Sequence, residues 1–218
     1  MKSILLIGLG KFGYLVGSEL LKMGNEVMVV DKDEERINMN ASKFTHAVSA
    51  NCASEEVLSS FNLKTFDACI VAIGDDFQSS LEITSLLKDL GAKYVISRAT
   101  TDIQKKFLLR SGADEVLYPD KDIAEKIAVK LNSKNVYDYF ELSEDHSIFE
   151  IVIPDGWMDK TLLEINPRKN YGINLLMIKR GDEVISSLDA EFTFKANDHM
   201  VVFAETSVIM KFTNKKIK

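Results

Sequence analysis

Three glycines near the N-terminus carry the clearest chemical signal in the sequence. In the segment ILLIGLGKFG, residues 4–13, they follow the spacing G-x-G-x-x-G, with an apolar run before them and a helical pattern after them. In that context Gly8 permits a tight turn, Gly10 lets a pyrophosphate approach the backbone, and Gly13 lets helix and strand pack closely. The free N–H groups at the helix start favour phosphate. The spacing predicts a nucleotide site; the alternative is a domain of the same shape that holds no ligand.

An aspartate follows at the distance expected for a ribose contact. Asp31 ends the run VMVVD, 23 residues after Gly8, and a carboxylate there accepts hydrogen bonds from ribose hydroxyls. It would repel a 2′-phosphate, which disfavours NADP. The alternative role for this carboxylate, the N-cap of the next helix, can be filled by Asp33 instead.

Further ligand contacts are expected where the later strands end, because nucleotides bind at the carboxyl ends of the strands in such sheets. Asn51 follows the third predicted strand and can bond an adenine edge through its amide, while Lys11 and Arg98 can meet phosphate. The segment VAIGDD brings the end of the fourth strand to the same edge. The predicted nucleotide-binding residues are Gly8, Gly10, Lys11, Phe12, Gly13, Asp31, Lys32, Asn51, Cys52, Ala72, Ile73, Gly74 and Arg98.

Residues for redox catalysis are not evident. A dehydrogenase needs a proton donor or acceptor beside the nicotinamide, and His46, His146 and His199 form no acid–base pair with a carboxylate nearby in the sequence. There is no Tyr-x-x-x-Lys pair, and no Cys/His cluster has metal-binding spacing. The sequence favours a protein that binds a nucleotide without transforming it, not an enzyme. The alternatives are a small NAD-dependent oxidoreductase and a stand-alone nucleotide sensor.

The elements that must position these residues alternate along the first 134 residues. Runs such as VMVV and CIVAI are too continuously apolar for a half-exposed hairpin and suit parallel strands covered on both faces. The pattern predicts an α/β fold: a Rossmann-like, doubly wound parallel sheet over residues 1–134. The predicted strands are Ile4–Ile7, Glu26–Val30, His46–Ala50, Ala68–Ile73, Tyr94–Arg98 and Glu115–Tyr118, and a helix is expected over Asp122–Leu131.

The pattern then changes to shorter elements. The polar, turn-prone segment NSKNVYDYFELSEDHS, residues 132–147, is interpreted as a hinge. IFEIVIP and DHMVVFAE predict strands, LLMIKRGDEVISS predicts a hairpin, and DKTLLEIN predicts a short helix that stops near Pro167. Residues 135–206 are therefore expected to form a small α+β lobe, followed by a tail, 207–218, that begins as a short helix.

The composition of the chain limits which partners and which cell compartment are expected. The chain has 218 residues and a net charge of −6, and neither lobe is basic, so a nucleic-acid partner is not expected. The two cysteines, Cys52 and Cys69, without a signal sequence indicate a reducing cytoplasm. No apolar run approaches the roughly 20 residues that span a bilayer, so direct membrane insertion is not expected.

Taken together, the sequence blocks resemble a known family. GLGKFG, EVMVVDKDEERIN, HAVSANCASEEVL, FDACIVAIGDDFQSS, GADEVLYPDKDIAEKIA and LLEINPRKNYGINLLMIKRGD are similar, in order, to blocks of the regulatory subunits of Ktr/Trk potassium-uptake systems, which are built from the RCK (regulator of potassium conductance) unit. The resemblance covers nearly the whole chain and implies an RCK N-terminal lobe followed by an RCK C-terminal lobe.

The resemblance implies a function as well as a fold. It implies a cytoplasmic gating subunit that forms homodimers, assembles as an octameric ring and lies on the inner face of the membrane beneath a Ktr/Trk-type potassium-transporting subunit. ATP and ADP, and also NAD(H), bind in the glycine-turn site of this family, ATP favouring the conducting state. Family members often have Arg at the position of Lys11 and Glu at the position of Asp120, near the γ-phosphate and a divalent cation such as Mg²⁺. Lys keeps the charge but loses the bidentate fork of Arg.

A second ligand is implied for the C-terminal lobe. Relatives often bind cyclic di-AMP there, and the matching stretch is LLEINPRKNYGINLLMIKR. By resemblance, Arg168 would pair with phosphate, Asn174 would bond an adenine edge, and Ile165, Ile173 and Leu175 would pack on the bases. The alternative is that this stretch only makes a dimer core. A proline that many relatives have near the site is missing from ISSLDAEF.

Overall fold

The computed structural model describes residues 1–132, 135–143 and 145–214. The chain divides into two compact units, Met1–Lys121 and Asp122–Lys218, which are described separately. This division falls earlier in the chain than the boundary at 134 expected from the sequence pattern, because helix α6, Pro119–Asn132, begins in the first unit and continues into the second.

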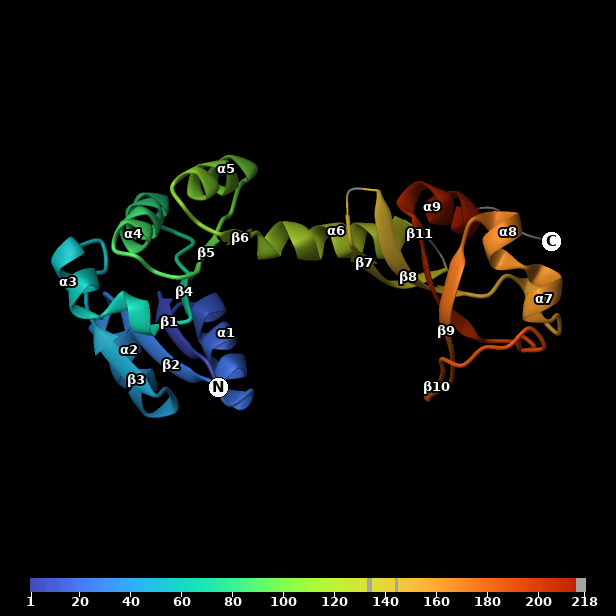
Figure 1. The fold of residues 1–218 in the computed structure, drawn as a ribbon, viewed down its shortest axis with the longest axis horizontal. Helices are drawn as coiled ribbons and strands as arrows, with labels where there is room; N and C mark the ends of the chain where they lie inside the picture. The colour runs from blue at the N-terminus through green and yellow to red at the C-terminus, as the bar shows by residue number, and fades with distance from the viewer. Residues whose placement is uncertain (133–134, 144, 215–218) are drawn as a thin grey trace. The chain divides into compact units, whose positions relative to one another are not determined.

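The first unit is a six-stranded parallel sheet with strand order β3-β2-β1-β4-β5-β6 (Figure 1). The order reverses between β1 and β4, which is the switch point at which such sheets bind ligands. The doubly wound fold predicted from the sequence is confirmed. The strands are β1 Ser3–Ile7, β2 Glu26–Asp31, β3 His46–Ser49, β4 Ala68–Val71, β5 Val95–Arg98 and β6 Glu115–Leu117; the helices are α1 Lys11–Lys22, α2 Glu34–Asn40, α3 Glu55–Ser60, α4 Phe77–Asp89 and α5 Asp102–Arg110, with 3₁₀ turns at Ala41–Lys43 and Leu63–Thr65.

Helices cover both faces of this sheet, which explains its continuously apolar strands. Leu5 and Leu6 are neighbours on β1 and point to opposite faces, yet neither side chain is exposed. Leu5 packs in a cluster with Leu58 of α3 and Ile83 of α4. Leu6 packs in a separate cluster with Ile37 of α2. Each face therefore has its own core, and the carboxyl edge of the strands stays free for a ligand.

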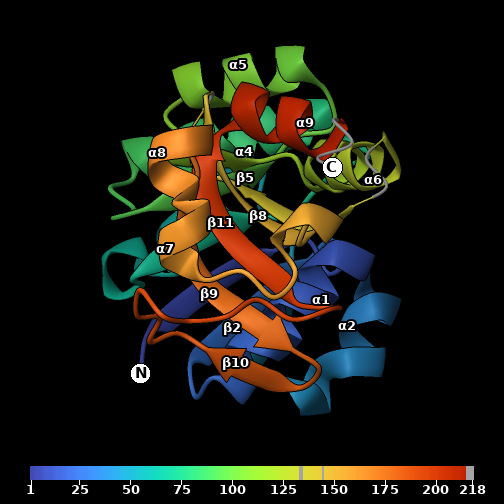
Figure 2. The ribbon, with the colours of Figure 1, turned by 90° about the vertical axis from the view of Figure 1, so that its right-hand side faces the viewer.

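The second unit contains a five-stranded antiparallel sheet with order β10-β9-β11-β8-β7, in which β11 lies between β9 and β8 (Figure 2). The described elements include strands, helices and one 3₁₀ turn, and the α+β lobe expected from the sequence is confirmed. The strands are β7 Val136–Glu141, β8 His146–Val152, β9 Asn174–Arg180, β10 Glu183–Ile185 and β11 His199–Glu205; the helices are α7 Leu162–Ile165, α8 Pro167–Tyr171 and α9 Thr206–Asn214, with the 3₁₀ turn at Asp155–Trp157.

Three details of this unit differ from the sequence-based expectations. The supposed hinge contains strand β7, an edge strand that buries Val136 but leaves most of its side chains to solvent, so its composition reads as polar. Pro167 does not only end a helix; it begins α8 at the first helical position, where its missing N–H costs nothing. The expected tail begins as a helix, α9, as predicted, but this helix is not peripheral, because its Ile209 and Phe212 belong to the core of the unit. Residues 133–134, 144 and 215–218, which fall in the expected hinge and tail, lie outside the described residues.

A buried ion pair closes one end of this second core. Asp198 is fully buried, and both of its oxygens accept hydrogen bonds from Arg180, each at 2.8 Å. The N–H of Lys195 donates to the same carboxylate at 2.8 Å. Burial raises the pKa of Asp198, but the hydrogen bonds from Arg180 and Lys195 outweigh burial, so the pKa lies below its ordinary value.

We expect Asp198→Asn to lower the free energy of unfolding of the second unit by about 2–3 kcal/mol, because it leaves Arg180 without its buried partner. The lowered pKa stabilises the fold above the ordinary Asp range and that contribution is lost as pH falls through the folded-state value. The difference between wild type and variant should therefore shrink below about pH 4. Denaturant titration followed by the fluorescence of Trp157, the one tryptophan of the chain and 1% exposed, measures it.

The matched control is Asp159→Asn, which removes the same charge from an exposed ion pair with Lys195 at 3.1 Å. It should change stability by less than about 0.5 kcal/mol. If both variants lose the same free energy of unfolding, the buried pair stabilises the second unit no more than the exposed pair does.

Candidate functional site

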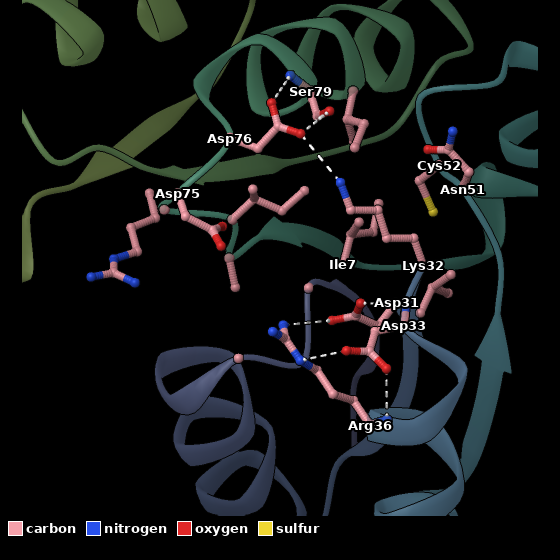
Figure 3. A pocket seen from close by; sticks show the side chains of 18 of the residues that line it. Ile7, Asp31, Lys32, Asp33, Arg36, Asn51, Cys52, Asp75, Asp76 and Ser79 are labelled. Carbon is pink, nitrogen blue, oxygen red and sulfur yellow. Dashed lines mark hydrogen bonds and ion pairs between the residues drawn. The ribbon is translucent and has the colours of Figure 1, made fainter.

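A pocket of about 520 Å³ lies at the carboxyl ends of the parallel strands, a volume within the usual range for small-molecule sites (Figure 3). Each of the strands β1 to β5 contributes to it at or just after its last residue. Most of the residues predicted from the sequence line this pocket: Gly8, Gly10, Lys11, Asp31, Lys32, Asn51, Cys52, Ala72, Ile73, Gly74 and Arg98.

The remaining predicted residues of the first unit adjoin the pocket without lining it. The guanidinium of Arg98 lies 5.1 Å from the ring centre of Phe12, and Nη2 of Arg98 bonds Oδ2 of Asp120 at 3.3 Å. Gly13 packs under the glycine turn. These residues therefore support the lining rather than form it.

The glycine turn has the geometry that its spacing predicts. Gly8 has φ +97°, a conformation that L side chains rarely adopt, and its N–H donates to the carbonyl of Val30 at 2.8 Å. A Cβ on Gly13 would lie 2.0 Å from the carbonyl oxygen of Gly8, so no side chain fits there. A Cβ on Gly10 would meet nothing within 4 Å, and Gly10 caps α1 without a side chain. The first N–H groups of α1 are thus left for an anion.

Asp31 ties this turn to strand β2. It is 7% exposed, and its Oδ2 accepts from the N–H of Leu9 at 2.6 Å while its Oδ1 accepts from the N–H of Asp33 at 2.9 Å. The cap of α2 is Asp33, whose side chain accepts from the N–H of Arg36. Asp31 is therefore not the helix cap, and its carboxylate lies in the pocket wall where a ribose contact was predicted.

Two residues after β3, Asn51 and Cys52, form one side of the pocket: the first is an exposed amide and the second a buried, uncharged thiol. Oδ1 of Asn51 accepts from the N–H of Ala53 at 3.1 Å, which leaves its amide N–H groups as donors. Cys52 is buried, and burial, with a smaller effect of the Asp31 charge, raises the pKa of its thiol to about 12. The thiol is thus uncharged at neutral pH and does not act as a nucleophile.

Sequence reasoning missed several lining residues: Asp33, Arg36, Asp75, Asp76, Ser79 and Thr100. Asp76 caps α4 and accepts from both the N–H and the hydroxyl of Ser79, and these bonds, with Lys32, hold the pKa of Asp76 below its ordinary value. Lys32 Nζ reaches Asp76 Oδ2 at 3.3 Å across the pocket (Figure 3). The D-x-x-S spacing of a helix cap was the sequence signal that could have marked this side.

Arg98 is the cation that enters the pocket from β5. Its side chain is 22% exposed, and its Nε is buried without a hydrogen-bond partner. Gly74 makes room for it, since a Cβ there would lie 2.9 Å from Nη1 of Arg98. An anion in the pocket would satisfy the unpaired Nε, so the residues present fit a phosphate-bearing ligand.

No ready-made metal centre accompanies these groups. The part of the chain that the structure describes holds no group of three or more His, Cys, Asp or Glu side chains able to bind a metal ion. Asp120, the predicted cation contact, pairs with Arg98. A cation at Asp120 would need further oxygen ligands, such as those of a nucleotide phosphate.

A groove of about 410 Å³ in the second unit gathers most of the residues predicted to contact a cyclic dinucleotide. Arg168, Ile173, Asn174 and Leu175 line it, whereas Ile165 is 6% exposed and belongs to the core instead. Arg168 is exposed, and the amide of Asn174 donates to the carbonyl of Phe203 at 3.4 Å. Ile173 is 0% exposed and belongs to the same core cluster, so both isoleucines are mainly core side chains, and their contact with a base stays a prediction.

We expect Gly13→Ala to lower the free energy of unfolding of the first unit by about 2 kcal/mol or more, because Cβ must displace the backbone of Gly8. Gly10→Ala is the matched control and should leave stability within about 0.5 kcal/mol of wild type. Thermal unfolding followed by circular dichroism compares them. Equal stability of the two variants would mean that the turn relaxes around position 13.

Comparisons with known proteins agree with this architecture. Residues 4–119 match the TrkA-N domain and residues 148–216 the TrkA-C domain. The chain is 40% identical over 211 residues to Ktr system potassium uptake protein C of Bacillus subtilis strain 168, covering 97% of this chain and 96% of that protein. It is 37% identical over 213 residues to Ktr system potassium uptake protein A of the same strain, covering 98% and 96%.

Solved structures give the same fold. The GsuK RCK domain superposes with a TM-score of 0.68 at 13% identity, covering 100% of this chain and 48% of that one. The GsuK channel bound to NAD does so with a TM-score of 0.66 at 14% identity, covering 95% and 38%. Among the described residues, none of the helices has the length and apolarity needed to cross a bilayer. The chain belongs to the family of Ktr-type potassium uptake proteins built from a TrkA-N and a TrkA-C domain.

Proposed function

We propose that this protein is a cytoplasmic regulatory subunit of a potassium uptake system and that it senses adenine nucleotides, ATP and ADP, in the pocket of its first unit. The observation that carries the proposal is the buried, unpartnered Nε of Arg98 in a pocket that also contains the glycine turn. The relatives that match almost the whole chain are potassium uptake proteins. We therefore propose that nucleotide binding regulates potassium uptake.

The side chains around the pocket support binding rather than chemistry. The described lining consists of carboxylates, cations, amide, hydroxyl and thiol groups, and small or aliphatic residues, with no histidine or tyrosine among them. The one thiol, Cys52, has a pKa of about 12. General acid–base work near neutral pH needs a group whose pKa lies close to the working pH, so the proposal assigns no catalytic role to this chain.

Each part of a nucleotide has a candidate partner. Asp31 would accept from the ribose hydroxyls, the amide of Asn51 would reach the base edge, and Lys11, Arg98 and the start of α1 would hold the phosphates. NAD(H) shares the adenosine diphosphate part and is proposed as a competing ligand; a GsuK channel structure contains NAD. A nucleotide changes the state of the protein only to the extent that its affinity differs between states.

Assembly belongs to the proposal as well. Helix α6 leaves Ile123, Ile127 and Leu131 exposed at 57%, 53% and 81%, spaced four residues apart along one face. Such a stripe suits contact with a second copy of the chain. We propose that homodimers formed in this way assemble into an octameric ring beneath a Ktr/Trk-type membrane subunit, with Mg²⁺ and Asp120 contributing where ATP binds.

We expect isothermal calorimetry to detect ADP and ATP binding that Gly10→Asp weakens at least tenfold. Position 10 has open space for a side chain, so the fold is kept while a carboxylate enters the phosphate region and repels the ligand. The charge control is Gly181→Asp in the β9–β10 turn, where there is also nothing within 4 Å but φ is +61°, a conformation that Asp adopts more readily than most residues; this variant should bind as wild type.

Two results would contradict the proposal. NADH binding with redox turnover, and no ATP or ADP binding, would favour the oxidoreductase. Nucleotide binding by a chain that never co-purifies with a co-expressed Ktr-type membrane subunit would favour a stand-alone sensor.

We further propose that the groove of the second unit binds cyclic di-AMP. Arg168 would meet a phosphate there, and the partly buried side chain of Leu175 would support a base, with Ile173 beneath it in the core. We expect Arg168→Ala to weaken cyclic di-AMP binding at least tenfold through loss of a charged hydrogen bond. Lys169→Ala removes the same charge from an exposed neighbour that does not line the groove and is the control. Calorimetry on the Gly10→Asp background separates this ligand from the first pocket; no heat with the unmodified chain would leave the groove a dimerisation surface.

A further inference from the structure

Arg98 is held by three elements of the first unit at once. Its guanidinium lies over Phe12 of α1, packs against Gly74 after β4, and bonds Asp120 in the first turn of α6. Only one of these contacts, that with Asp120, is an ion pair. The aromatic and glycine contacts fix where the guanidinium lies, and Asp120 is the partner that can be exchanged.

The ion pair between Arg98 and Asp120 is weak because the Asp120 side chain is exposed to solvent. Asp120 is 69% exposed and the N···O distance is 3.3 Å, values typical of pairs that add little stability in water. A phosphate in the pocket offers Arg98 a stronger, charge-assisted and bidentate partner. Arg98 lines the pocket and keeps 22% of its side chain exposed, so its guanidinium can meet such a phosphate.

Asp120 lies at a junction of the chain. A second ion pair, Lys121 Nζ to Asp102 Oδ1 at 2.8 Å, also joins the first turn of α6 to the first unit, and the chain divides into its two units directly after Lys121. These two pairs are side-chain anchors of the turn from which α6 runs into the second unit. Loss of one of them would loosen that turn.

The geometry points to Arg98 as a switch residue that exchanges Asp120 for a nucleotide phosphate, so that occupancy of the pocket releases the first turn of α6. This inference rests on the proposed nucleotide binding. It adds the contact through which ligand binding in the pocket would change the start of α6. Arg98 acts as the common partner, and in the absence of a divalent cation Asp120 competes with the phosphates of ADP for it. Phosphate-free ligands leave the Arg98–Asp120 pair in place.

Asp120→Asn tests the competition, with Asp102→Asn as the matched control. Both variants remove one carboxylate from an exposed ion pair at the start of α6, but only Asp120 contacts Arg98. In calorimetry with EDTA, Asp120→Asn should bind ADP about two- to fivefold more tightly than wild type, the range that an exposed ion pair can supply. Its affinity for adenosine should not change, and Asp102→Asn should match wild type for both ligands.

Amide hydrogen exchange gives the second readout. ADP should speed exchange at residues 123–126, whose N–H groups bond to the first turn of α6, in wild type and in Asp102→Asn. In Asp120→Asn the same amides should exchange faster before ADP is added and respond less to it.

The outcomes separate the inference from the function on which it rests. Unchanged or weaker ADP binding by Asp120→Asn, with normal binding by wild type, overturns the switch and leaves nucleotide sensing intact. If Asp120→Asn weakens ADP binding with Mg²⁺ and leaves it unchanged in EDTA, the switch is overturned too, because Asp120 then acts with ADP through a cation. No binding of ADP by wild type overturns the proposed function and the switch together.

Discussion

The hydrogen bond from the Leu9 N–H to the Asp31 carboxylate, at 2.6 Å, is the contact on which the first unit depends most. It joins the turn after β1 to the end of β2, and both residues are buried, Leu9 at 4% and Asp31 at 7% exposure, where such a bond is strong. With the turn fixed, α1 starts at Lys11 and its unpaired N–H groups face the pocket. The same carboxylate thus holds the turn that precedes α1 and also lines the pocket.

The first unit could be predicted well because each of its signals is local. Every strand of the sheet was expected within two residues of its observed ends, since buried parallel strands read as unbroken apolar runs. The glycine turn and Asp31 were found by spacing alone. The predicted set came together at one edge of the sheet because topology, rather than any single residue, places strand ends side by side.

What the sequence did not reveal depends on partners distant in the chain. Strand β7 was interpreted as a hinge, because an edge strand needs apolar side chains on one side only. Its pairing with β8 cannot be inferred from the residues of β7 alone. Asp76 and Arg36 line the pocket from the starts of α4 and α2. The sequence marks both segments as helix starts, but it does not tell in which direction their side chains point. The contact of Arg98 with Phe12 and Gly74 joins three segments, and no local pattern encodes it. Ile165 was assigned to a ligand, although an apolar residue of a short helix serves the core equally well.

The buried thiol of Cys52 has a consequence for how the pocket behaves under oxidative stress. Since burial raises its pKa to about 12, the thiol is protonated at neutral pH, and the thiolate is the form that peroxide and disulfides attack. Cys69, also buried and with a pKa of about 12, is equally protected. The fold thus places a buried, uncharged sulfur in the wall of the pocket, and we expect this thiol to resist oxidation while the first unit stays folded.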